Sequence, residues 1–193
     1  MDSNWFHVYK PSNSCDLLLL MALSRVLLSL MDSPPYVILL NDYKYSHYDF
    51  LNRLQKVVRL YKLDLSLSYK NVNKSSILQN IRLLGCIDGV VLNLISDLFD
   101  QPVYNVCANT SFPCHGIPLL GEITNVIFHL FLTNVFDRKM VKSYPGLTYS
   151  RLGHEVFIAT RANDEFIFDK NEAESLLSDI NLYGEIEFIE PDD

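Results

Sequence analysis

In the first half of the chain, segments with a helix-like pattern of apolar positions alternate with short apolar runs that are typical of strands. Residues 17–31 are almost continuously apolar and follow a polar loop, which predicts a helix covered on most sides. Residues 36–40 form a short apolar run, typical of a strand buried on both faces, and residues 90–95 and 102–109 repeat this pattern. Residues 50–61 and 75–84 have apolar positions at helical spacing and predict amphipathic helices.

The second half of the chain is richer in predicted strands. Residues 109–122 contain two prolines and two glycines, which predict a loop, and residues 123–137 have β character in their second half. Residues 154–161 and 164–169 predict a β-hairpin, residues 172–180 a short helix and residues 184–190 a last strand. The pattern predicts an α/β fold: a sandwich with a mostly parallel sheet and an antiparallel hairpin at its C-terminal edge. We expect one core domain over residues 1–170, with residues 171–193 as its acidic C-terminal extension.

Composition narrows the class of protein. The chain has 193 residues, about half of them apolar, which suits a single globular domain. The apolar run at 17–31 contains Arg25 and is shorter than the roughly 20 residues of a membrane span, so we expect no membrane segment. The four cysteines form no Cys-x-x-Cys pair and no secretory signal is evident. We therefore expect reduced thiols in a nuclear protein, which could also occur in the cytoplasm, because cysteine use does not distinguish these two compartments.

Charge is distributed unevenly along the sequence. The net charge is −7, yet residues 1–154 hold 14 basic and 11 acidic residues, whereas residues 155–193 hold 2 basic and 12 acidic ones. This asymmetry predicts an interaction surface on each part, although an acidic tail also serves solubility alone. Arg138, Lys139 and Lys142, with Tyr144 nearby, form a candidate DNA contact, for which a solvated helix or loop face is the alternative.

Two kinds of reactive site fit the sequence poorly. Cys107, Cys114 and His115 lack both a fourth ligand and the paired spacing of structural zinc sites, so we expect no metal. Cys114 beside His115 also fits a cysteine nucleophile poorly, because neighbours in sequence rarely have the required mutual geometry. A small cysteine-dependent enzyme centred on Cys114 stays as a minor alternative.

The order of elements over residues 5–165 resembles the core of RecA-type recombinases, and within them the degenerate paralogues of Shu-type complexes. The resemblance is carried by YVILLND, by DFLNRLQKVVRLYKLD, by GVVLNLISDLF and by the segment IPLLGE before a predicted strand that ends in a basic residue. It implies a phosphate-binding loop at residues 10–16 and a metal-binding carboxylate at the end of the strand at 90–95.

The chain departs from that family where the family binds nucleotide. A phosphate-binding loop needs glycines, a Lys and a Ser or Thr, but KPSNSCD has no glycine, and Lys10 lies at its wrong end. Ser14 is followed by Cys15 and Asp16 where Lys-Thr would stand, and Asn93 occupies the metal-carboxylate position. The sequence therefore predicts no ATP hydrolysis, no cofactor and no enzymatic activity.

By resemblance, the protein is expected to be a non-catalytic recombinase paralogue in a Shu-type complex. Such a complex would stabilise recombinase filaments on single-stranded DNA during homologous recombination and DNA repair. The implied partners are the recombinase or another paralogue, a SWIM-type zinc-finger protein and single-stranded DNA. Trp5, Phe6 and Tyr9 are the candidate partner interface, and we expect an obligate hetero-oligomer. A RecA-like pseudo-ATPase subunit of the Elongator ring, which acts on tRNA, is the alternative assembly.

Overall fold

The computed structural model describes residues 14–30, 37–38, 57–85, 87–100, 103–105, 110–112, 116–118, 121–145, 147–161 and 168–189. The chain divides into two compact units that interleave along the sequence. Unit 1 comprises residues 1–31 and 69–131, and unit 2 comprises residues 32–68 and 132–193. Each unit is described by itself below.

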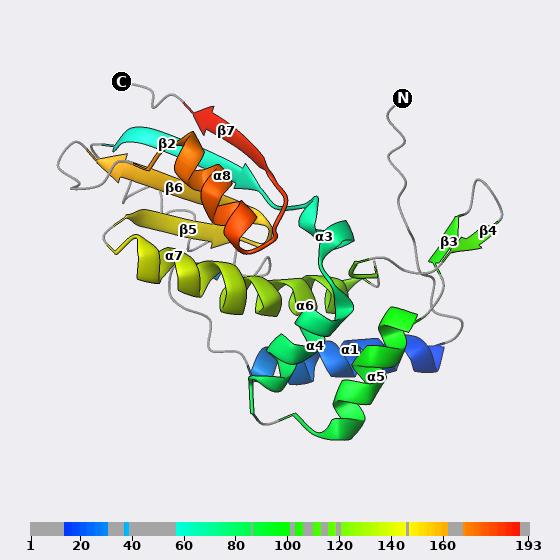
Figure 1. Ribbon diagram of the computed structural model, residues 1–193. Coiled ribbons are helices and arrows are strands. Elements are labelled where there is room, and N and C mark those ends of the chain that lie inside the picture. The colour runs from blue at the N-terminus through cyan, green and yellow to red at the C-terminus, as the bar shows by residue number, and fades with distance from the viewer. Residues whose placement is uncertain are drawn as a thin grey trace. The chain divides into compact units, whose positions relative to one another are not determined.

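Unit 1 is mainly helical. Its helices are α1 (Ser14–Ser29), α4 (Lys74–Arg82), α5 (Gly89–Asp100) and α6 (Glu122–Leu132), the last of which ends one residue beyond the unit boundary (Figure 1). The short helix α3 (Ser68–Asn71) begins at the unit boundary between residues 68 and 69, and β3 (Val103–Asn105) pairs with β4 (Thr110–Phe112) in an antiparallel ribbon. The core of the unit contains fully buried side chains from three helices, namely Leu27, Ile77, Ile81 and Ile95.

Unit 2 is built on an antiparallel sheet. Its strands are β1 (Val37–Ile38), β2 (Val57–Asp64), β5 (Thr148–Leu152), β6 (Glu155–Arg161) and β7 (Glu185–Ile189). The sheet order is β1-β5-β6-β2-β7, and β5, β6, β2 and β7 pair antiparallel throughout. The two-residue strand β1 pairs parallel with β5.

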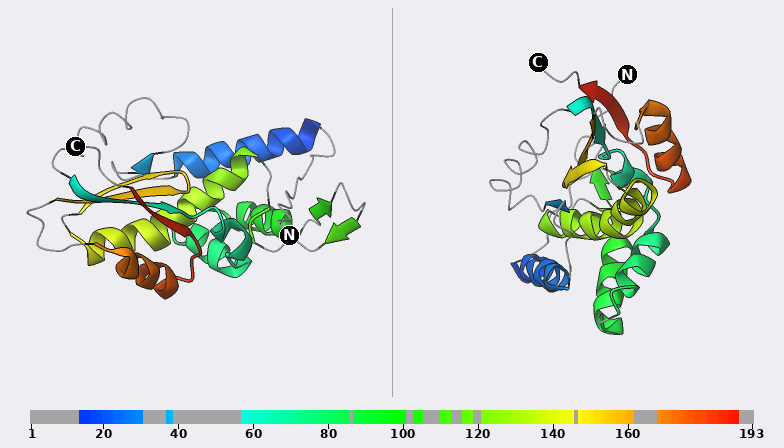
Figure 2. Two further views of the ribbon diagram at one scale, coloured as in Figure 1. Left: turned by 90° about the horizontal axis from the view of Figure 1, so that it is seen from above. Right: turned by 90° about the vertical axis from the view of Figure 1, so that its left-hand side faces the viewer.

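One face of this sheet is covered by helices. The π-helix η2 (Thr133–Asp137), α7 (Arg138–Ser143) and α8 (Lys170–Asp179) belong to unit 2, and α7 and α8 lie on the same side of the strands (Figures 1 and 2). Side chains alternate between the two faces of a strand. Tyr61 and Leu63 of β2 are buried, and the Tyr61 ring contacts that of Phe168, which directly precedes α8. Lys62 and Asp64 therefore project to the opposite face.

This sheet corrects the expected fold. A RecA-like sandwich with a mostly parallel sheet is wrong, because among the described residues β5, β6, β2 and β7 pair antiparallel with one another. The parallel pair in this sheet is that of the two-residue strand β1 with β5. The predicted strand at 90–95 is part of helix α5, and residues 123–137 form α6 and η2 instead of a strand. Residues 57–61 of the predicted helix at 50–61 belong to strand β2 instead, and residues 50–56 lie outside the described part of the chain.

Other predicted elements are confirmed. The helices α1, α4 and α8 and the strands β6 and β7 occur where the pattern placed them, and β1 lies inside the apolar run at 36–40. However, α1 is not covered on most sides, because Leu17, Leu18, Met21 and Val26 are 41–64% exposed. The segment at 109–122, predicted as a loop, contains the short strand β4. The expected domain boundary at residue 170 coincides with the first residue of α8, inside unit 2.

Candidate functional site: a charged cluster at one end of the sheet

Charged side chains of unit 2 gather where β2 ends, and we call Lys62, Asp64, His154 and Glu155 the strand-end cluster. Asp64 is the last residue of β2 and lies directly opposite Glu155, the first residue of β6. His154 lies in the tight turn that joins β5 to β6, and its carbonyl accepts a hydrogen bond of 3.0 Å from the backbone N–H of Leu65. The sheet therefore fixes the backbone of every member of the cluster.

Asp64 is held as an ionised carboxylate. Its Oδ1 accepts a hydrogen bond of 2.8 Å from the backbone N–H of Ser66 and lies 4.0 Å from Nε2 of His154. Burial by itself would raise the pKa of Asp64. The hydrogen bonds from the Ser66 backbone and side chain, with the charges of His154 and Lys62, outweigh burial and lower the pKa below its ordinary value. A deprotonated oxygen ligand is thus present at neutral pH.

Lys62 pairs with Glu155 across the two strands. Its Nζ lies 2.5 Å from Glu155 Oε1, with both side chains 28–29% exposed. The hydrogen bond to Glu155 raises the pKa of Lys62, partial burial opposes this, and the charges of Glu155, Asp64 and Glu187 raise it further. Lys62 therefore contributes a positive charge to the cluster.

The acidic side chains continue onto the next strand. Asp64 is flanked in register by Glu155 on β6 and by Glu185 on β7, so three carboxylates share one row across three strands. Glu187 lies opposite Lys62 in the adjacent row. Like charges placed directly opposite each other in a sheet are unfavourable. The row therefore carries more negative charge than Lys62 neutralises, which favours the approach of a cation.

A buried ion pair supports the turn that carries His154. Arg151 and Asp137 are both fully buried, and Arg151 Nη2 lies 2.6 Å from Asp137 Oδ2 while its Nε lies 2.9 Å from Oδ1. The Tyr149 hydroxyl donates to the same carboxylate. Burial and the Asp137 charge raise the pKa of Tyr149, so it stays a neutral donor.

The same guanidinium reaches both the turn and the π-helix. Arg151 Nη1 donates to the carbonyl of Gly153 at 2.6 Å, and Nη2 donates to Oγ1 of Thr133 at 3.0 Å. Thr133 and Asp137 are the first and last residues of η2, and Gly153 has a positive φ of 60°. π-Helical turns within α-helices are often found near functional sites. Here η2 supplies two side chains that accept hydrogen bonds from Arg151. Arg151 in turn holds the carbonyl of Gly153, the residue before His154.

The residues singled out from the sequence lie elsewhere or are not described. Trp5, Phe6, Tyr9, Lys10, Cys107, Cys114 and His115 lie outside the residues that the structure describes. Ser14, Cys15 and Asp16 form the first turn of α1, and Cys15 is exposed. Asn93 is an exposed residue of helix α5, so the expected position at the end of a buried strand is wrong.

The basic residues Arg138, Lys139 and Lys142 do lie together on α7. Lys139 Nζ forms a surface ion pair of 2.7 Å with Asp179 of α8, whereas Arg138 and Lys142 are exposed. The strand-end cluster was missed because Asp64 ends a segment that also fits helical spacing. The alternation of buried Tyr61, Leu63 and Leu65 was the signal that could have identified the strand.

Two further observations limit the chemistry. Among the described residues, no three His, Cys, Asp or Glu side chains are grouped so that they could hold a metal ion by themselves. Within the same part of the chain, no helix is both long and apolar enough to cross a membrane. The cluster thus offers oxygen ligands at a strand end but does not enclose an ion.

Comparison with known proteins finds a similar sequence in maize. No family model matches the chain. The chain is 38% identical over 178 residues to a maize (Zea mays) protein described as an uncharacterized 39 kDa protein in mitochondrial S-1 and S-2 DNA. The match covers 92% of this chain, but the chain spans only about half of the maize protein, 52% of its length.

Proposed function

We propose that this protein binds nucleic acid without turning it over, and that the strand-end cluster contacts phosphate through a divalent cation. The observation that carries the proposal is the row of three carboxylates, with Asp64 kept ionised at its centre. Mg²⁺ is typically bound by one or two protein carboxylates together with substrate phosphates and water. A site that offers carboxylates without enclosing the ion suits that division of ligands.

The charge of the cluster argues for a bridging cation. Phosphate alone would meet three carboxylates and one lysine, and would be repelled. A divalent ion reverses this, because it is attracted by Asp64 and Glu155 and then attracts the phosphate. We limit the proposal to binding because, among the described residues, no group of three His, Cys, Asp or Glu side chains is placed so that it could hold an ion by itself. The row of carboxylates would share the ion with phosphate oxygens and water.

The description of the related maize protein supports a mitochondrial location. Its description places it in mitochondrial S-1 and S-2 DNA, so we propose that this chain also acts in mitochondria, on DNA or on RNA copied from it. The expected nuclear location gains no support from this relative. The recombinase-paralogue and Elongator roles were inferred through a RecA-like fold. The antiparallel sheet removes that argument, so we do not carry them forward.

The test is cation-dependent binding of an oligonucleotide. Wild-type protein should bind Mn²⁺, detected by electron paramagnetic resonance, and should bind a single-stranded oligonucleotide more tightly with Mg²⁺ than with EDTA. Asp64→Asn should weaken Mn²⁺ binding by about tenfold, the loss of a charged ligand being worth at least 1.4 kcal/mol. Asp97→Asn, at an exposed position on α5, is the matched control and should leave both measurements unchanged.

Two results would count against the proposal. One is oligonucleotide binding of equal strength in Mg²⁺ and in EDTA. The other is Mn²⁺ binding that Asp64→Asn and Asp97→Asn reduce equally, because this would place the ion outside the strand-end cluster.

A second candidate function is favoured by helix α1. Leu17, Leu18, Leu19, Met21 and Val26 are each at least 41% exposed, whereas its buried side is the narrow stripe of Leu20, Leu23, Ser24 and Leu27. Exposed apolar side chains gathered on one helix are typical of protein–protein contacts. This keeps the expectation of a hetero-oligomer as a proposal. Leu18→Glu should then abolish co-purification of a specific partner, and a monomer that co-purifies with none would contradict it.

A further inference from the structure

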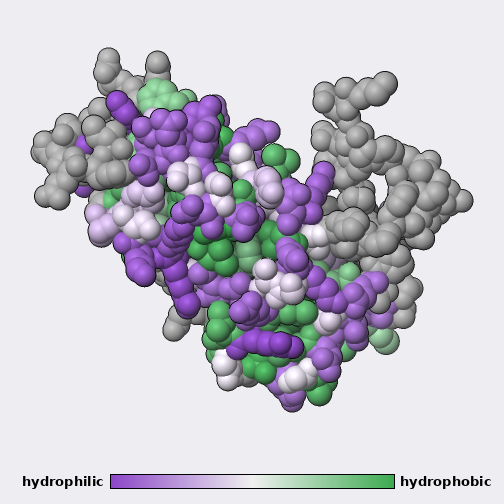
Figure 3. Space-filling model, viewed as in Figure 1, coloured by the Kyte–Doolittle hydropathy of each residue, from purple (hydrophilic) through white to green (hydrophobic). Residues whose placement is uncertain are grey.

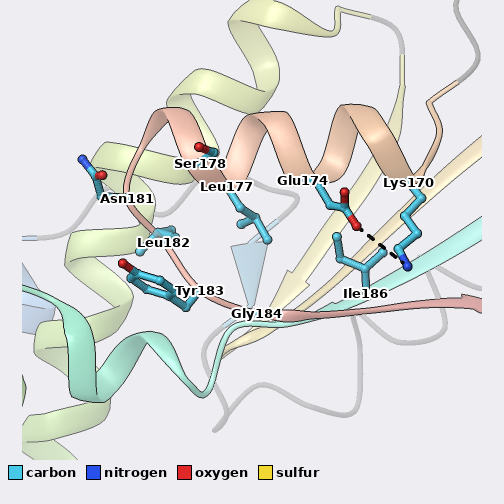
Figure 4. Close-up of a pocket in the computed structure, with 9 residues that line it drawn as sticks. All are labelled: Lys170, Glu174, Leu177, Ser178, Asn181, Leu182, Tyr183, Gly184 and Ile186. Carbon is cyan, nitrogen blue, oxygen red and sulfur yellow. Dashed lines mark ion pairs between the residues drawn. The ribbon is translucent and has the colours of Figure 1, made fainter.

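Unit 2 contains a cavity that the strand-end cluster does not use. It has a volume of about 480 Å³ and lies between α8, the connecting residues 180–184 and β7 (Figure 4). Cavities of roughly 300–1,000 Å³ are the usual size of small-molecule sites. In Figure 4, Leu177 points down from α8 and Ile186 rises from β7, so the two define an apolar floor. Figure 3 shows hydrophobic surface bordered by hydrophilic residues beside the C-terminal end of α8.

The loop that closes this cavity is held rigidly. The fully buried Ser68 hydroxyl donates to the carbonyl of Tyr183 at 2.6 Å and accepts from its N–H at 2.9 Å. The N–H of Leu182 donates to the carbonyl of Leu177 at 2.9 Å. Gly184 packs so closely that a Cβ atom there would lie 2.7 Å from the carbonyl oxygen of Asp64. The backbone is therefore fixed before any ligand arrives.

Two side chains on this rigid loop remain available. The Tyr183 side chain is exposed (55% for the residue), although its backbone is clamped on both sides. Asn181 has a positive φ of 53°, a conformation in which Asn is favoured, and it is exposed at the end of the helix. An aromatic ring and an amide with both donor and acceptor groups thus line one cavity.

The charges of the cavity exclude strongly charged ligands. Among the described residues that line it, Lys170 and Glu174 are the charged ones, and they pair with each other, Nζ to Oε1, at 3.8 Å (Figure 4). Their charges cancel, so neither a free phosphate nor a metal cation finds a net attraction. An apolar floor, an aromatic ring and an amide instead suit a flat, uncharged molecule with hydrogen-bonding edges.

The geometry points to a binding site for an uncharged planar heteroaromatic ring, of which a nucleobase is the biological example. The base would contact the apolar floor and the Tyr183 ring, and the Asn181 amide, which points away from Leu177 and Ile186 in Figure 4, would turn to meet its edge. The same chemistry is presented by a free nucleoside and by a base of single-stranded nucleic acid. This site is independent of the strand-end cluster, because it needs no cation and Asp64 and Glu155 do not line it.

Titration with nucleosides in the absence of divalent cations tests the inference. Isothermal titration calorimetry of the full chain with adenosine, guanosine, cytidine and uridine should give saturable one-to-one binding of at least one of them. Tyr183→Leu should weaken it by roughly five- to hundredfold, the range expected for stacking one base on an aromatic ring. Tyr183→Phe keeps the ring and should retain most of the affinity. Asn181→Gly keeps the positive φ and should alter the preference among the four nucleosides.

Two controls distinguish specific binding from misfolding, and a competition experiment identifies the natural source of the ligand. Phe188→Leu removes an exposed aromatic ring on β7 that does not line the cavity, and should leave nucleoside binding unchanged. Hydrogen exchange of the 182–184 amides should be the same in Tyr183→Leu as in wild type, because the Ser68 hydroxyl holds only backbone atoms of Tyr183. Displacement of the nucleoside by a homopolymeric single strand would identify the natural source as nucleic acid, and failure to displace would identify a free nucleoside.

Three outcomes would overturn the inference: no saturable binding of any nucleoside, equal binding by Tyr183→Leu, or displacement of the nucleoside by inorganic triphosphate. Because all titrations omit divalent cations, failure here is distinct from failure of the strand-end cluster to bind a cation.

Discussion

Asp137 and Arg151 form an ion pair with no exposure to solvent, so their value to the fold can be tested by removing one charge. Asp137→Asn leaves the Arg151 charge buried, which typically costs about 3–5 kcal/mol. We expect a loss of that size in the free energy of unfolding, measured by urea denaturation. Lys139→Met breaks the surface ion pair between α7 and Asp179, the last residue of α8, and should cost less than about 1 kcal/mol. Equal losses for both variants would show that the Arg151 network does not support the sheet.

Tyr144 predicts a dependence of stability on alkaline pH. Burial, followed by its 3.0 Å hydrogen bond to Glu172, raises the pKa of Tyr144 to about 12 from 10.0. Because the folded pKa is the higher one, its contribution is complete below pH 10 and is lost as pH rises through about 12. Tyr144→Phe should therefore show a shallower fall in stability between pH 10 and pH 12 than wild type. Parallel curves over that range would contradict the assignment.

Single residues explain part of what sequence reasoning missed. Arg151 carries a charge in a strand where pattern alone would place it at the surface, and only its pairing with Asp137 makes burial favourable. Asp64 lies three residues beyond the helix predicted at 50–61, and its cross-strand neighbours Glu155 and Glu185 are distant in sequence. The acidic charge of residues 155–193 was visible, but its alignment with Asp64 depends on strand register, which the sequence does not reveal.

At the scale of elements, the errors have a common cause. Residues 90–95 and the second half of 123–137 are rich in β-branched and aromatic side chains, which favour strands by local propensity. Both segments belong to helical runs of at least 11 residues, a length that suits a helix better than a strand. Buried surroundings decide the outcome at α6, where Ile123, Val126, Phe128 and Phe131 are all at most 4% exposed.

The start of α5 gives a direct test of this reassignment. Asp88 Oδ1 accepts a hydrogen bond of 2.9 Å from the N–H of Val90, in the first turn of the helix. This is the role of an N-cap, whose replacement by Ala costs about 0.5–2 kcal/mol. We expect Asp88→Ala to lower the free energy of unfolding by that amount, whereas Asp88→Asn, which can also cap, should lie close to wild type. No difference between these variants would argue against a helix that begins at Gly89.

At the scale of the whole molecule, the sequence could not show the division into two units. Each unit is assembled from two separated segments, with boundaries after residues 31, 68 and 131. No change of composition marks these points, and the last one falls inside the helical run that begins with α6. A prediction made along the chain therefore finds one domain, because compactness in three dimensions depends on contacts between distant segments.

The two units have separate cores, which predicts separate responses to core mutations. Ile77 of unit 1 and Ile158 of unit 2 are both fully buried. Truncating a buried isoleucine to alanine typically costs about 2–5 kcal/mol. In Ile77→Ala we expect faster hydrogen exchange at the amides of α4 and α5, and little change in β2 and β6. Ile158→Ala should show the reverse, measured by mass spectrometry of peptides from the full chain.

The pattern of exchange then has a structural meaning. Amides that open only together with their own core define a cooperative unit, so reciprocal patterns would mean that each unit is stabilised mainly by its own buried side chains. If both variants accelerated exchange equally in all four elements, the chain would unfold as one body. The interleaved segments 32–68 and 132–193 would then share their stability with unit 1, and the division at residues 31, 68 and 131 would carry no energetic weight.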